Sequence, residues 1–115
     1  MFNNDTTILI NKSLGDSETL IGTIDLSNYS GYSFIVISSK SDMANSVFNP
    51  TFTKIELNSD LIEVYSIVSE TSSKRYTRKG YLRIDSNGNI YGKANSGYTV
   101  TLNCCLIPCK NVITF

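Results

Sequence analysis

The sequence predicts an all-β protein, an antiparallel β-sandwich of about eight strands with a jelly-roll-like arrangement. Three observations lead to this fold class. Apolar or alternating segments recur at roughly 8–12-residue spacing, with Gly, Asn, Asp and Ser between them. Residues 74–85 alternate between polar and apolar positions and precede Asn87-Gly88, which is typical of a β-hairpin. No segment has the apolar spacing that is expected of a helix.

The first part of the chain contains three predicted strands. Residues 6–10 and 20–26 are rich in Ile, Leu and Thr, and a turn is expected between them over residues 11–17. The third strand is residues 32–38. It contains the continuous apolar run Phe34–Ile37, so we expect it to be central and covered on both faces.

The rest of the chain is predicted to form five more strands after a long loop. Residues 38–49 are that loop, and loops of this length often carry binding residues. The strands that follow are residues 51–57, 61–68, 74–85, 90–93 and 99–115. The Asn87-Gly88 step predicts a type I′ turn, because both residues accept positive φ. We expect one domain over residues 1–115, with residues 1–5 frayed.

The last predicted strand, residues 99–115, changes the phase of its alternation. The apolar positions are Val100, Leu102, Cys104 and Leu106, then Ile107, Cys109, Ile113 and Phe115. Pro108 lies at the change, so we expect a bulge or a bend there. Adjacent Cys104 and Cys105 point to opposite faces of a strand, and Cys105 lies roughly 13 Å from Cys109, too far for a disulfide. Three reduced and mostly buried thiols are therefore expected.

Composition and charge argue against several classes of function. Ten acidic and ten basic residues give no net charge to attract nucleic acid or an anionic membrane, and the zero net charge favours self-association. The chain has no histidine, which removes Ser-His-Asp and Cys-His catalysis and weakens any metal site. Neither a secretory signal nor a membrane-spanning apolar run is visible.

Glu56 and Glu63 could approach each other as the two carboxylates of a glycosidase, although a solvated sheet face explains these residues as well. We expect no enzymatic activity, no cofactor, no nucleic-acid binding and no membrane insertion.

Two features of the sequence point to a ligand surface. Half of the basic residues lie within ten positions, namely Lys74, Arg75, Arg78, Lys79 and Arg83. Basic and aromatic side chains together on a strand bind phosphate or acidic glycans, although basic residues also protect exposed strands from edge pairing. The chain also has seven tyrosines and no tryptophan, and tyrosine contacts sugars, subunit interfaces and sheet neighbours. The candidate ligand-binding residues are Tyr81, Arg83, Arg78 and Tyr91.

Two segments of the chain resemble a known protein family. Gly22-Thr-Ile-Asp-Leu-Ser-Asn-Tyr-Ser-Gly-Tyr-Ser-Phe-Ile-Val-Ile37 is similar to the opening of a C-terminal domain of phage and prophage tail, baseplate and tail-fibre proteins. Cys105-Leu-Ile-Pro-Cys-Lys-Asn-Val-Ile113 resembles the end of that domain. The arginine-bearing strand and the Asn-Gly hairpin resemble the family as well. The chain departs from it after Pro108, where the family has Tyr-Lys-Ile-Tyr-Gly and this sequence has Cys-Lys-Asn-Val.

The resemblance implies a β-sandwich, often a trimer at a tail tip, that attaches the virion to a bacterial surface saccharide. It implies other tail proteins as partners, folding in the bacterial cytoplasm and a final location in the virion tail. It offers no catalytic residues. Two alternatives remain open: a structural virion or assembly protein whose tyrosine-rich face is a subunit interface, or a bacterial carbohydrate-binding module.

Overall fold

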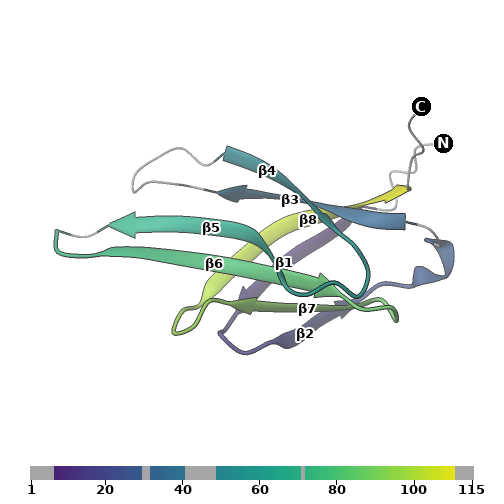
Figure 1. The fold of residues 1–115 in the computed structure, drawn as a ribbon, viewed down its shortest axis with the longest axis horizontal. Helices are drawn as coiled ribbons and strands as arrows, with labels where there is room; N and C mark the ends of the chain where they lie inside the picture. The colour runs from purple at the N-terminus through teal and green to yellow at the C-terminus, as the bar shows by residue number, and fades with distance from the viewer. Residues whose placement is uncertain (1–6, 30–31, 41–48, 71, 111–115) are drawn as a thin grey trace.

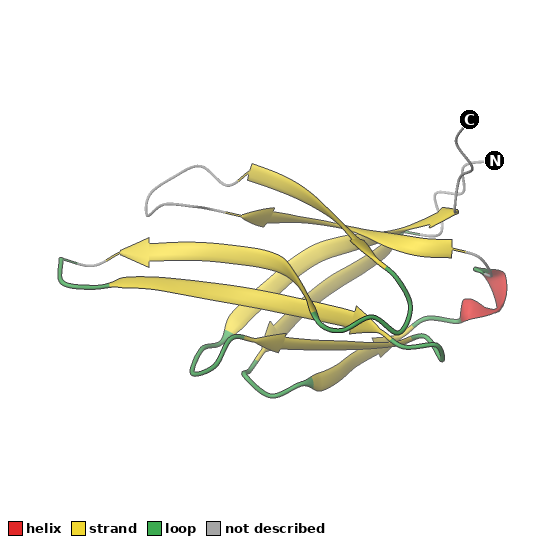
Figure 2. Cartoon of the chain, viewed as in Figure 1, coloured by secondary structure: helices red, strands yellow, loops and turns green. Residues whose placement is uncertain are grey.

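The protein, seen in a computed structural model, consists almost entirely of strands (Figures 1 and 2). The structure describes residues 7–29, 32–40, 49–70 and 72–110. The strands are β1 (Ile8–Leu14), β2 (Thr19–Thr23), β3 (Tyr32–Lys40), β4 (Asn49–Ile55), β5 (Ile62–Glu70), β6 (Arg75–Ile84), β7 (Asn89–Ala94) and β8 (Val100–Lys110). A short 3₁₀ helix, Leu26–Asn28, follows Asp25, whose carboxylate accepts a hydrogen bond from the Ser27 N–H at 3.1 Å.

The eight strands form one curved sheet that is nearly barrel-shaped. Their order is β1-β8-β3-β5-β6-β7-β2, and β4 also pairs with β3. Among the described residues, the pairings are antiparallel except for a single parallel bridge between Lys40 of β3 and Ser66 of β5. This bridge divides the sheet into a first layer, β1-β8-β3-β4, and a second layer, β5-β6-β7-β2. The predicted all-β fold with about eight strands is therefore confirmed.

One buried core lies between the two layers. It is built from alternate residues of each strand, because a strand directs every second side chain to the same face. The first layer supplies Ile10, Leu14, Phe34, Val36, Ile55, Val100, Leu102, Cys104 and Leu106, and the second supplies Val64, Leu82, Ile84, Ile90 and Ala94. At Gly92 a Cβ would lie only 3.1 Å from the Leu14 side chain, so this glycine allows the layers to approach closely.

The last strand, β8, lies between β1 and β3 and has no bulge at Pro108, which is one of the two distortions predicted there. Its register with β1 and its register with β3 both run without a shift. Pro108 pairs with Phe34 and lies past the last described pair with β1, where a residue without an N–H is tolerated. The change of phase instead reflects Ile107 and Cys109, which lie on the outer face and are half-buried.

The three cysteines are free thiols, as predicted. Cys104 is buried in the core, whereas its neighbour Cys105 is half-buried on the opposite face of β8. Burial raises the pKa of the Cys104 thiol to about 12. This cysteine therefore behaves as a small apolar core residue.

The β6–β7 hairpin forms where it was predicted, but its turn is of another type. Gly88 has a φ of 84° and Asn87 does not have a positive φ, so the predicted type I′ turn is wrong. The Gly88 N–H donates to the Asp85 carbonyl at 3.0 Å, as in a three-residue loop whose type I turn ends in a left-handed glycine. The Asp85 carboxylate also accepts the N–H groups of Asn89 and Asn87, each at 2.9 Å. These hydrogen bonds, of which the one from the Asn89 N–H has the largest effect, lower the pKa of Asp85. They also favour the observed turn.

Strand bounds differ from the prediction mainly near the start of the chain. The turn expected over residues 11–17 begins only after Leu14, because β1 continues to pair with β8 as far as Val100. In β2 the register shifts between Leu20 and Gly22, and Leu20 is left exposed. The predicted frayed residues 1–5 and most of the predicted loop 38–49 lie outside the described residues.

The expectation for β3 holds only in part. β3 is central in the first layer, between β8 and β4, and its Phe34 and Val36 are fully buried. Ile35 and Ile37 on its other face are only half-buried, however. Coverage on both faces is therefore wrong for the single chain, because only one face of the layer packs on the core.

Candidate functional site

The four candidate ligand-binding residues lie on two different surfaces. Tyr81, Arg83 and Tyr91 lie on the outer face of the second layer, where β6 pairs with β7. Arg78 has the same parity as the buried Gly80 and therefore projects from the core-facing side of β6. The structure does not bring the four together into one site.

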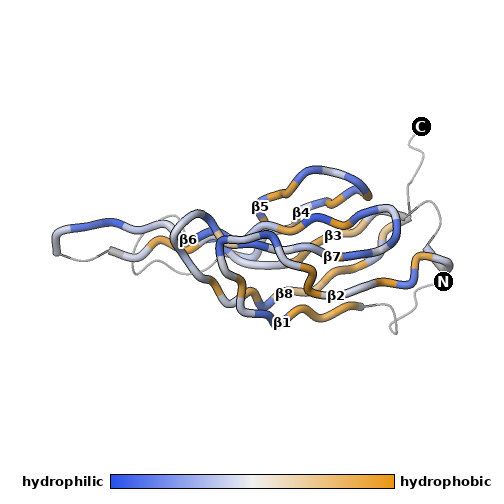
Figure 3. Tube along the Cα trace, turned by 90° about the horizontal axis from the view of Figure 1, so that it is seen from below, coloured by the Kyte–Doolittle hydropathy of each residue, from blue (hydrophilic) through white to orange (hydrophobic). Residues whose placement is uncertain are grey.

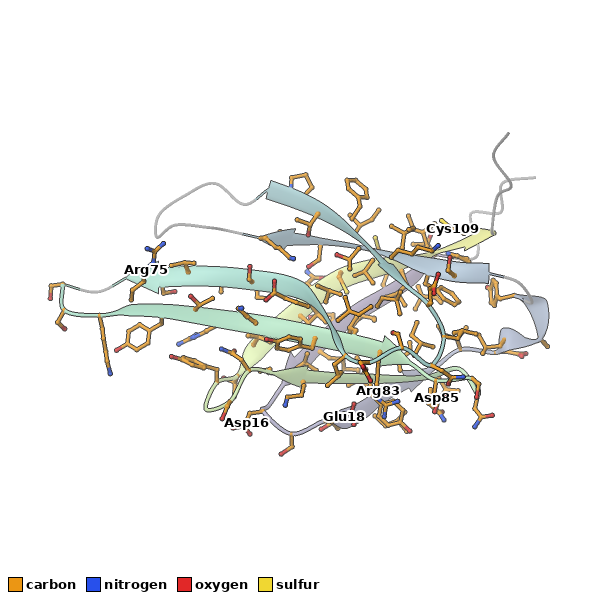
Figure 4. All side chains as sticks on the ribbon, in the orientation of Figure 1. Asp16, Glu18, Arg75, Arg83, Asp85 and Cys109 are labelled. Atoms are coloured by element: carbon orange, nitrogen blue, oxygen red, sulfur yellow. The ribbon has the colours of Figure 1, made fainter. Side chains whose placement is uncertain are left out.

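Arg83 is occupied by contacts within the protein (Figure 4). Its guanidinium carbon lies 4.1 Å from the centroid of the Tyr91 ring, and its Nε and Nη2 donate to the two carboxylate oxygens of Glu18. These hydrogen bonds raise the pKa of Arg83 and lower the pKa of Glu18. The three side chains tie the start of β2 to β6 and β7, so we assign Arg83 and Tyr91 a structural role.

Tyr81 lines a shallow hollow on the same outer face. The hollow has a volume of about 260 Å³ and is lined by Leu61, Tyr81, Lys93, Asn95 and Ser96. The Asn95 amide is already used, because its Oδ1 accepts the Lys79 N–H at 2.9 Å and its Nδ2 donates to the Thr77 carbonyl at 2.8 Å. The groups left for a ligand are the Tyr81 ring, the Lys93 ammonium and the Ser96 hydroxyl.

The two glutamates considered as a glycosidase pair are each bound to lysines. Glu63 contacts Lys79 at 3.1 Å and Lys40 at 3.2 Å, and Glu56 contacts Lys54 at 3.3 Å. Burial raises the pKa of Glu63, but the hydrogen bonds from Lys79 and Lys40 outweigh this effect and hold it below its ordinary value. Glu63 therefore stays ionised at neutral pH, as part of an ion-pair network across β3, β5 and β6.

A second hollow, which we call the Arg78 cleft, lies where the β5–β6 hairpin passes the ends of β1 and β8. It has a volume of about 240 Å³ and is lined by Ser13, Tyr65, Ile67, Ser69, Arg78, Thr99, Val100 and Thr101. A register shift between Glu63 and Tyr65 places Tyr65 opposite Gly80, and Ile67 opposite Arg78. This bulge turns these residues toward the cleft, while the outer part of the hairpin extends beyond the body of the sheet (Figure 1).

The side chains that line the Arg78 cleft could contact a polar ligand. Within the described residues, the Arg78 side chain has no hydrogen bond or ion pair. Its guanidinium is a planar donor suited to carboxylate, sulfate or phosphate groups. Tyr65 and Ile67 supply apolar surface, and four hydroxyl-bearing residues surround them: Ser13, Ser69, Thr99 and Thr101. Hydroxyl groups can both donate to and accept from a sugar.

Sequence reasoning found Arg78 but missed its surroundings. Grouping it with Arg83 by proximity in sequence was wrong, because an odd separation along a strand places two residues on opposite faces. That parity was a signal the sequence contained. The approach of Ser13, Tyr65 and Thr99 had no such signal, because it depends on the β5 bulge and on the pairing of β1 with β8.

Comparisons of the chain with protein-family models, curated proteins and solved structures find no match. In the part of the chain that the structure describes, no group of three or more Cys, Asp and Glu residues is placed to hold a metal ion. The same residues include no helix of the length and apolarity that crossing a membrane requires. The Tyr81 hollow, the Arg78 cleft and the sequence resemblance are therefore the basis for a proposed function.

Proposed function

We propose that this chain is a non-catalytic module of a phage or prophage tail that binds a bacterial surface saccharide, and that the Arg78 cleft contacts the glycan. The observation that carries the proposal is a guanidinium without a partner among the described residues, in a cleft that also contains a tyrosine and four hydroxyl-bearing residues. A sugar with an acidic substituent has the matching chemistry, with hydroxyls for the serines and threonines and an anion for Arg78.

The size of the cleft fits one sugar unit better than a large ligand. Its volume of about 240 Å³ is just below the roughly 300–1,000 Å³ of typical small-molecule pockets. A single site of this kind binds weakly. Several copies on one virion compensate, because linking weak sites raises the apparent affinity by about 10²–10⁴. This agrees with the tail-tip role that the sequence resemblance implies.

The proposal is tested by comparing two variants that lose one positive charge each. Arg78→Ala removes the cation of the cleft, and Lys93→Ala removes the cation of the Tyr81 hollow. Each protein is coupled to beads in many copies and applied to an array of bacterial cell-wall and capsular polysaccharides. We expect the native chain to retain an acidic polysaccharide, Arg78→Ala to lose at least about tenfold in binding, and Lys93→Ala to bind normally.

Thermal unfolding monitored by circular dichroism verifies that both variants fold. If Lys93→Ala loses binding and Arg78→Ala does not, the site is the Tyr81 hollow. If the native chain retains no polysaccharide on the array, the saccharide-binding function is wrong. Arg83→Ala and Tyr91→Ala are poor probes of binding, because both side chains hold strands together.

A further inference from the structure

The outer face of the first layer carries a row of apolar side chains across four strands. Leu9 of β1 pairs with Cys105 of β8, Cys105 pairs with Ile37 of β3, and Ile37 pairs with Phe52 of β4. Paired residues project to the same face of a sheet, so these four side chains form a continuous line. We call it the apolar row. Its two ends are exposed, Leu9 by 80% and Phe52 by 70%.

The apolar row has an apolar neighbour and few charges near it. The adjacent row contains Ile107 and Ile35, both half-buried, and ends at Lys54. Lys54 is paired with Glu56, so the charges at this edge cancel. In Figure 3 the tube is orange, the hydrophobic end of the scale, along parts of β1, β3 and β8. Exposed apolar residues in such a contiguous arrangement mark an interaction surface.

The outer face of the second layer has the opposite character. It carries the Glu63–Lys79 and Arg83–Glu18 ion pairs, and Glu63 also contacts Lys40 at the end of β3. A partner that matched the charged layer would be polar, whereas a partner for the apolar row must itself be apolar and carry few charges. The first layer itself has these properties, and the chain has no net charge to oppose self-association.

The dimensions of the first layer set the size of such a contact. Four strands about 4.8 Å apart and seven residues at about 3.4 Å each give a face of roughly 19 by 24 Å. Its plane covers about 460 Å², somewhat more than half of the roughly 800 Å² that each partner buries in a standard protein interface, and the projecting side chains add to this area. Two sheets packed face to face with nearly aligned strands, about 10 Å apart, are a common arrangement.

We propose that the first layer binds the same face of a second copy of this chain, in a two-fold symmetric dimer. A two-fold axis near Cys105 and Ile37 would place Leu9 of one copy against Phe52 of the other, and Phe52 against Leu9. This reversed pairing would cover the two large exposed side chains at the ends of the row, with the half-buried ones at its centre. The proposal is independent of saccharide binding, and it leaves the outer face of the second layer uncovered.

Sedimentation equilibrium and light scattering across the micromolar range test the proposal. We expect a dimer for the native chain and a dimer for the control Leu20→Lys, which places the same charge on an exposed leucine of the second layer. Phe52→Lys should weaken dimerisation at least about tenfold, because it puts a charge where a large apolar side chain would be buried against Leu9 of the other copy. Leu9→Lys repeats the test at the other end of the row, should Phe52→Lys fail to fold.

Alkylation of Cys105 gives a second measurement, in a Cys109→Ser background. We expect the thiol to react slowly in the concentrated native protein, and faster after dilution or in Phe52→Lys. A native protein that stays monomeric throughout this concentration range would overturn the proposal. A trimer would overturn the two-fold pairing, and so would equal effects of Phe52→Lys and Leu20→Lys. An alkylation rate independent of concentration in a dimer would show that another face is buried.

Discussion

Replacement of Gly88 by alanine should be among the most damaging single changes in the chain. Gly88 has a φ of 84°, and a side chain in this region costs about 1–2 kcal/mol. A Cβ at this position would also overlap the carbonyl oxygen of Ile24 and lie 3.1 Å from the Leu26 side chain. The segment that follows β2 would therefore have to move away from the β6–β7 turn.

The cost of that movement follows from two interactions. The Ile24 N–H donates to the Gly88 carbonyl at 2.7 Å, and losing such a bond costs about 1 kcal/mol. Ile24 is 6% exposed, and partial loss of its burial costs about 1–2 kcal/mol more. Together with the about 1–2 kcal/mol for a side chain at positive φ, these losses mean that Gly88→Ala should lower the free energy of unfolding by about 3–5 kcal/mol.

Gly97 is the matched control for this change. Its φ is 81°, but a Cβ there would meet no atom within 4 Å. Gly97→Ala should therefore cost only the conformational term, about 1–2 kcal/mol. Urea unfolding of both variants, followed by circular dichroism, measures the difference. If the two variants differ by less than about 0.5 kcal/mol, the close contact with Ile24 does not limit this turn.

Two further predictions follow from titratable groups. The pKa of Glu63 is lowered in the folded chain, so its contribution to stability is full above its unfolded pKa and disappears as the pH falls through its folded pKa. Glu63→Gln should therefore be less stable than the native chain at pH 7, with a gap that closes below about pH 4. Urea unfolding of the two proteins at pH 7 and below about pH 4 measures this difference in unfolding free energy. A difference that is the same at both pH values would contradict the ion-pair argument. Cys104, with a thiol pKa of about 12, should resist iodoacetamide at pH 8 until urea unfolds the chain. Detection by mass spectrometry of modified Cys104 in the native state would show that its side of β8 opens.

Local sequence patterns predicted the strands, because period-two alternation records which face of a strand is buried. The alternation from Tyr76 to Ile84 and from Val100 to Leu106 gave the core positions of β6 and β8. The same pattern could not fix the ends of β1, whose Asn11 to Ser13 are polar and become strand only by pairing with β8. Pairing with a neighbouring strand, and not the local residue types, determines whether such a segment is a strand.

The candidate site was less predictable than the fold, because it depends on contacts between distant segments. Arg83 meets Glu18 across 65 positions of sequence, and nothing near either residue indicates the pairing. The bulge at Val64-Tyr65 likewise leaves no local signature, although it places Tyr65 in the Arg78 cleft. The apolar Ile35 and Ile37 led to the prediction that β3 is covered on both faces, whereas both side chains are only half-buried in the single chain. A second chain packed on the outer face of the first layer would explain why these positions are apolar.

The position of β8 between β1 and β3 has a consequence for synthesis of the protein. Residues 100–110 form β8, which leaves the ribosome after all seven of the preceding strands. In the sheet, however, β8 lies between β1 and β3 and pairs with both. Until then, β1 and β3 present unpaired edges beside apolar side chains, a state open to aggregation and to proteases. The first layer can form only when translation has passed Lys110, so this fold matures late and as a unit. Nascent chains arrested before Val100 should be cleaved rapidly, and chains arrested within a linker fused after Phe115 should resist.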